Sequence, residues 1–95
     1  MPTLLLDGVG WKTADDFYNA FLEAVGAPPW HGRNFNALRD SIAGGDINAV
    51  GLPYDIVVLG TSKMSEPALA IVERFRELIE ELRSAGTRVS IEMQE

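Results

Sequence analysis

The sequence has no cysteine, a single histidine and few basic side chains. Without cysteine the chain can form neither a disulfide framework nor a thiolate metal site. A catalytic set of serine, histidine and carboxylate would have to use His31, and no serine lies in a Gly-x-Ser-x-Gly turn. We therefore expect that the protein is not an enzyme and that it needs neither a metal nor another cofactor.

The shortage of positive charge bears on the kind of partner. Eight lysines and arginines stand against fourteen aspartates and glutamates, which gives a formal net charge of −6. Affinity for phosphate requires lysine and arginine, so the composition argues against a nucleic-acid partner and is compatible with a basic protein. The first seven residues hold three leucines with no basic flank, too short a run for a signal peptide or a membrane span. We expect a cytoplasmic protein without membrane contact.

Length and apolar content predict one domain over residues 1–95, because 46% of these residues are hydrophobic. Three segments are typical of strands: Thr3–Leu6, Tyr54–Leu59 and Arg88–Met93. The second is β-branched and apolar on both faces beyond Asp55, as a central parallel strand is. The third alternates polar and apolar residues, which indicates an edge strand.

Helices are predicted over three segments, each with a capping residue at its start and glycine at its end. They run from Thr13 to Gly26, from about Asn34 to Gly44-Gly45-Asp46, and from Ser62 or Ser65 to Gly86. Right-handed crossovers then place the helices on one face of a parallel sheet. We predict a two-layer α/β fold with sheet order 1-2-3 against three to four helices. The alternative is order 2-1-3.

The segment Pro29–Asp40 combines a loop that carries two large rings with the start of a short helix. Asn34 is a good N-cap, and an apolar stripe follows it at helical spacing. The stripe is Phe35, Leu38 and Ile42, which leaves Arg33, Asn36, Arg39 and Asp40 at the rim or on the outward side. Rings, a glycine and a projecting carboxylate on one small scaffold indicate a contact surface rather than an active site.

The run Trp-His-Gly-Arg-Asn-Phe-Asn-Ala-Leu-Arg-Asp resembles a segment of the barstar family, the intracellular inhibitors of barnase-type ribonucleases. The residues in matching places are Gly32, Asn34, Ala37, Leu38 and Asp40. The resemblance implies the barstar fold, with three parallel strands packed against helices. It also implies that Asp40 enters a ribonuclease active site in the place of a substrate phosphate. A rigidly presented carboxylate satisfies the cations that a nuclease holds ready for phosphate.

The resemblance also assigns expected roles to the neighbours of Asp40. Trp30 and His31 fill the places of two tyrosines, and their rings are expected to stack on the nuclease. The alternative for Trp30 is a ring folded back on the core. Asn34 is expected to act more as a cap than as a contact. A further acid from the long helix is Glu77 or Glu81, and the alignment from Gly86 favours Glu81. The predicted partner-binding residues are Trp30, His31, Gly32, Arg33, Asn34, Asn36, Arg39, Asp40, Gly44 and Glu81.

Three positions depart from the family pattern. Arg33 stands where barstars have an acid, Asn36 replaces an aspartate, and Arg39 replaces a tryptophan. Two cations beside Asp40 weaken the acidic patch, which fits a relative adapted to a different toxin, because specificity often depends on repulsion of wrong partners. Arg39 is expected to meet an acidic group on the target.

The sequence thus leads to one hypothesis and two alternatives. The hypothesis is a cytoplasmic barstar-like immunity protein, or antitoxin, that is a monomer when free and binds a basic bacterial ribonuclease toxin one to one. The first alternative keeps the fold and the surface but has a partner that is not a ribonuclease. The second is a small ligand-binding domain that uses the carboxyl edge of the sheet, around Gly8–Gly10 and Gly60–Ser62.

Overall fold

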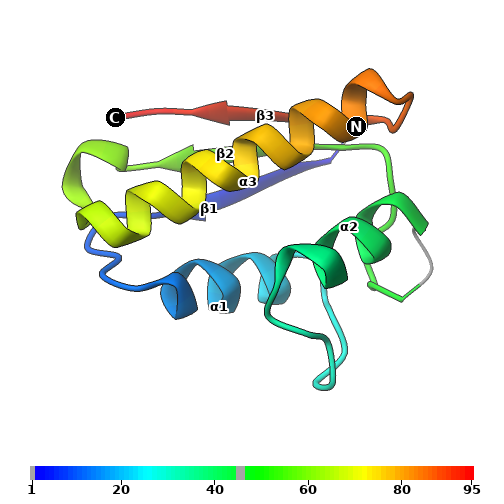
Figure 1. Ribbon diagram of the computed structural model, residues 1–95, viewed down its shortest axis with the longest axis horizontal. Helices are drawn as coiled ribbons and strands as arrows, with labels where there is room; N and C mark the ends of the chain where they lie inside the picture. The colour runs from blue at the N-terminus through cyan, green and yellow to red at the C-terminus, as the bar shows by residue number, and fades with distance from the viewer. Residues whose placement is uncertain (1, 45–46) are drawn as a thin grey trace.

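A three-stranded parallel sheet forms the centre of the computed structural model, which describes residues 2–44 and 47–95 (Figure 1). The strands are β1 (Thr3–Asp7), β2 (Tyr54–Leu59) and β3 (Val89–Met93), in the order β1-β2-β3. The predicted order 1-2-3 with a central second strand is therefore confirmed. Gly45 and Asp46, predicted to close the second helix, lie outside the described residues.

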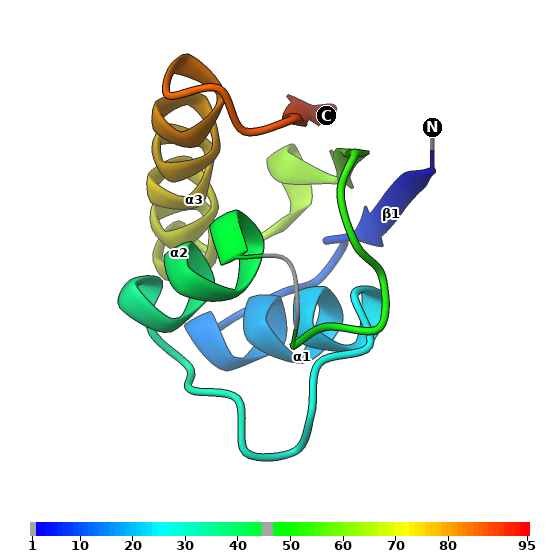
Figure 2. The same cartoon turned by 90° about the vertical axis from the view of Figure 1, so that its right-hand side faces the viewer.

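All helices of the described ranges lie on one side of this sheet, as Figures 1 and 2 show together. They are α1 (Ala14–Ala24), α2 (Phe35–Gly44), the short 3-10 helix η1 (Thr61–Lys63) and α3 (Glu66–Ser84). The opposite face of the sheet stays open. Leu5, on that face of β1, is 62% exposed, and Val57 beside it on β2 is half-buried. The predicted two-layer α/β architecture is confirmed, although the apolar outer face of β2 has no helix over it.

Local sequence explains where the helices begin and end. The carboxylate of Asp16 accepts hydrogen bonds from the backbone N–H groups of Lys12 and Thr13, at 2.8 and 3.2 Å, and so organises the start of α1. The Ser65 hydroxyl accepts from the N–H of Ala68 at 3.2 Å, so Ser65 rather than Ser62 begins α3. Gly26 and Gly86, with φ of +66° and +101°, end α1 and α3.

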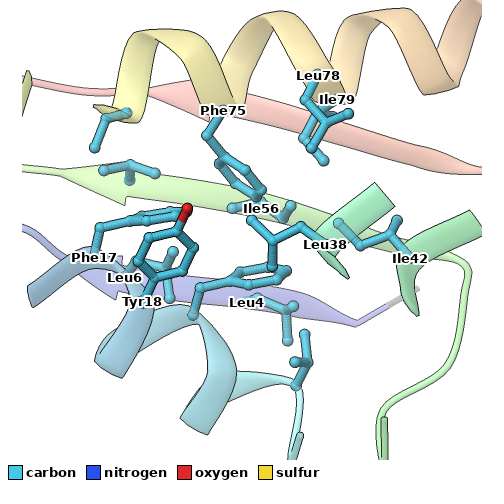
Figure 3. Packing of buried hydrophobic residues seen from close by; sticks show 14 of the residues in the cluster. Leu4, Leu6, Phe17, Tyr18, Leu38, Ile42, Ile56, Phe75, Leu78 and Ile79 are labelled. Carbon is cyan, nitrogen blue, oxygen red and sulfur yellow. The ribbon is translucent and has the colours of Figure 1, made fainter. Parts of the chain in front are cut away.

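The core fills the space between the sheet and the helices (Figure 3). Phe75 of α3 lies between Phe17 and Phe21 of α1, with ring centroids 4.8 and 5.0 Å apart. Leu38 and Ile42 reach into this core from α2 and are almost fully buried. Burying such side chains stabilises the fold by about 1.5–3 kcal/mol each. The packing therefore fixes α2 on the body of the domain.

Candidate protein-contact surface

The connection between α1 and α2 extends away from the helices that it joins (Figure 2). Within it the N–H of His31 donates to the carbonyl of Pro28 at 3.0 Å, which closes a turn around Trp30. The indole of Trp30 is 71% exposed. The alternative in which this ring folds back on the core is therefore wrong.

Helix α2 presents Asp40 on its outward side. The Asn34 side chain accepts a hydrogen bond from the N–H of Ala37 at 2.8 Å, so the predicted cap is confirmed. Leu38 and Ile42 anchor the opposite face of the helix, and Asp40 is exposed. Among the described residues, Asp40 makes no ion pair. A capped and well-seated helix thus holds a carboxylate toward solvent.

A small hollow lies between Trp30 and Asp40. Its volume is about 190 Å³, and its lining is Trp30, His31, Gly32, Ala37, Asp40 and Ile47. Ile47 is 41% exposed and adds an apolar wall that the sequence did not reveal, because it lies in a segment with only a weak apolar pattern. An apolar hollow with a carboxylate in its lining suits a cationic side chain whose aliphatic stem packs on the apolar wall.

The ring of His31, which was expected to stack on the nuclease beside Trp30, is buried and is not available for stacking in the free chain. The imidazole is only 7% exposed. Its Nε2 lies 2.8 Å from the hydroxyl of Ser41, and its Nδ1 lies 2.7 Å from the carbonyl oxygen of Gly32. The signal for this contact was Ser41 itself, a polar residue three positions after Leu38 on the buried face of α2. Such a residue requires a hydrogen-bond partner.

The two arginines that flank the surface both meet polar partners inside the chain. Arg33 donates to the side-chain oxygen of Asn19 at 2.5 Å and lies 3.5 Å from the carboxylate of Asp15. Arg39 donates to Glu81 of α3 at 3.0 Å. In the free chain the acidic partner of Arg39 is therefore Glu81, which lies next to α2, and an acid on the target that meets Arg39 stays a prediction. Exposed pairs of this kind contribute at most about 1 kcal/mol to stability. They nevertheless offset both cations beside Asp40.

The remaining predicted contacts differ in their surroundings. A Cβ atom on Gly32 would lie 3.0 Å from the Asn34 amide nitrogen and 3.1 Å from the Cβ of Ala37, so glycine allows the loop to approach α2 closely. Asn36 and Gly44 are exposed. A Cβ on Gly44 would meet nothing within 4 Å. Within the described ranges, no group of three or more His, Cys, Asp or Glu side chains could hold a metal ion.

The carboxyl edge of the sheet, proposed by the second alternative as a ligand site, is occupied by the chain's own loops. Backbone hydrogen bonds of 2.9 Å join the β1–α1 loop to the segment that follows β2. They run from Gly8 to Leu59, from Gly10 to Lys63 and from Ser65 to Trp11. A Cβ on Gly60 would lie 2.5 Å from the Val9 side chain. This edge is therefore closely packed where a ligand would have to enter.

Two further findings concern the chain as a whole. In the described part of the chain, no helix has both the length and the apolar character needed to cross a membrane. Comparison with known families gives a match to a family model described as Barstar (barnase inhibitor), over residues 1–94. Among curated proteins, none matches the chain. The family match spans the three strands, the three α-helices and every predicted contact residue.

Proposed function

Since the chain belongs to the barstar family, we propose that it is the immunity protein of a secreted bacterial ribonuclease toxin. The family description, barnase inhibitor, supports an inhibitory function and a ribonuclease as the general kind of partner. In the proposed complex a cytoplasmic monomer binds one toxin molecule and covers its active site. The protein then acts by binding alone, without a cofactor and without catalysis.

The observation that carries this proposal is the presence of both Trp30 and Asp40 in the lining of one hollow. A ribonuclease holds cationic side chains ready for the phosphates of RNA. A carboxylate that stands on a seated helix offers these cations strong, charge-assisted hydrogen bonds. Little ordering is needed on binding, because α2 is already fixed by Leu38 and Ile42. The exposed indole of Trp30 supplies a rigid apolar anchor beside the charge.

Electrostatics support the same partner. The net charge of −6 attracts a basic protein over a distance. Arg33 and Arg39 lie close to Asp15 and Glu81, so neither arginine presents an uncompensated positive charge beside Asp40. We propose Glu81 as the second acid of the contact surface, at its rim. Arg33, Asn34, Asn36, Arg39, Gly32 and Gly44 complete the proposed contact, with His31 beneath it.

The first experiment measures binding and inhibition with defined nucleases. The purified chain is titrated by calorimetry against the ribonuclease encoded nearest to its gene and, separately, against barnase. RNA cleavage is followed in parallel. We expect a one-to-one complex with the cognate enzyme and loss of cleavage at equimolar inhibitor. Binding without inhibition would favour the alternative in which the same surface serves another purpose.

The site assignment is tested by Asp40→Ala. We expect the affinity for the cognate ribonuclease to fall by about 30-fold or more, as for a central interface residue. The matched control is Glu92→Ala, which removes the same charge from the exposed side of β3. An Asp40→Ala variant that binds as tightly as the wild type would show that the proposed surface is not the contact.

A further inference from the structure

Two hollows flank the loop between α1 and α2. A hollow of about 380 Å³ separates it from α1, with Asn19, Pro29 and Arg33 in its lining. The hollow of about 190 Å³ that is lined by Trp30 and Asp40 has residues of both the loop and α2 in its lining. His31 contributes to the lining of both hollows. With a hollow on each side, the hydrogen bonds of the buried His31 are among the contacts that hold the loop in place.

The ring of His31 makes the bond that crosses from this loop to α2. A carbonyl oxygen can only accept, so Nδ1 carries the proton and donates to Gly32. In the neutral ring Nε2 is then an acceptor, and the Ser41 hydroxyl donates to it over 2.8 Å. The carbonyl of Leu38, at 3.3 Å from the same hydroxyl, is the longer alternative. Both the imidazole and the hydroxyl are buried, so neither group can turn to water instead.

This bond joins the immediate neighbours of the two proposed contact residues. His31 follows Trp30 in the loop, and Ser41 follows Asp40 on α2. We propose that His31 is a positioning residue, whose hydrogen bond to Ser41 holds Trp30 and Asp40 at a fixed separation for one partner. The inference rests on the proposed function, and it adds a role for a residue that does not itself touch the partner.

The physical consequence of losing this bond is a loop that must be ordered during binding. Ordering a released segment and its side chains opposes association, so the affinity falls although every contact residue is still present. We expect a 5- to 10-fold weaker complex, roughly the cost of ordering one or two side chains. The buried Ser41 or His31 left without its partner also lowers stability, so binding must be measured where every variant is fully folded.

The chain allows a matched pair of substitutions at His31. The side-chain amide oxygen of glutamine can take the place of Nε2 and accept from the Ser41 hydroxyl, so His31→Gln keeps a hydrogen bond to Ser41. Asparagine places its amide at Nδ1, so His31→Asn keeps only the local bond to Gly32. Binding of the ribonuclease encoded nearest to the gene is measured by stopped flow. We expect His31→Gln to bind within about twofold of the wild type, and His31→Asn and Ser41→Ala to bind 5- to 10-fold more weakly.

Ser90→Ala is the control, because it also removes a hydrogen-bonded serine hydroxyl. Ser90 donates to Asp55 on the open face of the sheet, away from α2. We expect this variant to lose stability but to keep the wild-type affinity. Equal affinity of the wild type, His31→Asn and Ser41→Ala would overturn the proposal, as would a His31→Gln variant that binds as weakly as His31→Asn.

A second measurement needs no partner. The ¹⁵N order parameter of the Trp30 indole N–H is recorded in the free protein, with the buried Trp11 as the reference in the same spectrum. We expect the order parameter of Trp30 to fall in His31→Asn and Ser41→Ala and to stay unchanged in His31→Gln and Ser90→Ala. An unchanged Trp30 in all four variants would contradict the proposal. If Asp40→Ala binds normally while Trp30 responds as expected, the proposed function is wrong and His31 still holds the loop.

Discussion

The carboxyl edge of the sheet and the proposed contact surface on α2 are both built from loops and glycines, yet their polar groups have different surroundings. At the carboxyl edge the backbone groups of Gly8, Gly10 and Ser65 are bonded to neighbouring loops. At the contact surface the polar groups beneath, His31 and Ser41, are bonded to each other. The surface above them presents an exposed indole and an exposed carboxylate.

This difference separates structural loops from the proposed binding surface. The carboxyl edge is where open α/β sheets commonly bind ligands, but here its hydrogen bonds and its space are used by the chain itself. At α2 the buried polar groups of His31 and Ser41 bond to each other, and the charge of Asp40 and the apolar ring of Trp30 stay exposed above them. An exposed large apolar side chain beside an exposed charge is the more informative observation about function.

The largest expected effect is a loss of stability caused by a substitution at the carboxyl edge of the sheet, called the closed edge below. Gly60→Ala places a Cβ at φ +75°, 2.5 Å from the Val9 side chain and 2.8 Å from its backbone nitrogen. Left-handed backbone strain and the clash together should lower the free energy of unfolding by about 2–4 kcal/mol. Urea denaturation measures this change. The affinity of the folded variant for its ribonuclease should stay unchanged, since the edge is far from the proposed contact.

Gly44→Ala is the matched control for that substitution. Its Cβ meets nothing within 4 Å, and Gly44 is the last residue of α2. We expect no loss of stability, and a gain of up to about 1 kcal/mol from the lower entropy of the unfolded chain. If the two alanine variants were equally stable, the account of the closed edge would be wrong.

The next effect is on binding. Trp30→Ala should weaken the complex by about tenfold, because an exposed aromatic anchor is lost. Its free energy of unfolding should change by less than about 0.5 kcal/mol, because the ring is exposed to solvent and is not part of the core. Val9→Ala removes an exposed apolar side chain from the closed edge and should bind normally. If Trp30→Ala and Val9→Ala weakened binding equally, the loop before α2 could not be distinguished from the carboxyl edge as the contact region.

A smaller effect is expected on the rate of association. Arg39→Ala frees Glu81 and makes the contact surface more acidic, so association with a basic ribonuclease should accelerate a few-fold at low ionic strength. Stopped-flow measurements over a range of salt concentrations should show the gain disappearing as charge is screened. The control is Arg76→Ala, which breaks the ion pair with Glu80 within α3. A rate for Arg39→Ala that does not rise above that of Arg76→Ala would contradict this expectation.

The smallest effect concerns pH at the start of α1. Hydrogen bonds from the backbone N–H groups of Lys12 and Thr13 hold the pKa of Asp16 below its ordinary value. A lowered pKa in the folded state gives stability that is present above about pH 4 and is lost as the pH falls further through the folded pKa. We expect the urea midpoint of the wild type to fall more steeply below pH 4 than that of Asp16→Asn. The urea midpoint of Glu92→Gln should fall with pH as steeply as that of the wild type. If the midpoint of Asp16→Asn also fell this steeply, the lowered pKa of Asp16 would not be the cause.

Much of the fold could be predicted because its signals are local. Asn34, Ser65, Gly26 and Gly86 mark helix ends through bonds and dihedral angles within a few residues. The strand Tyr54–Leu59 was recognisable as the central one from its composition alone. The same reasoning placed Leu38 and Ile42 in the core and Asp40 on the opposite side of α2.

The parts of the site that could not be predicted depend on packing between distant segments. Arg39 and Glu81 are 42 residues apart and meet only because α2 lies beside α3. His31 reaches Ser41 across a loop whose course the sequence does not specify. Ile47 joins the hollow from a segment without a clear pattern. The sequence therefore predicts the surface, and the structure separates its exposed residues from the buried residues beneath them.

Amide hydrogen exchange of the chain, free and bound to the ribonuclease encoded nearest to its gene, compares the two regions most directly. We expect binding to slow exchange in residues 28–44 and to leave exchange in residues 8–12 and 60–65 unchanged. Slower exchange at the carboxyl edge, with none in the loop and α2, would contradict this expectation.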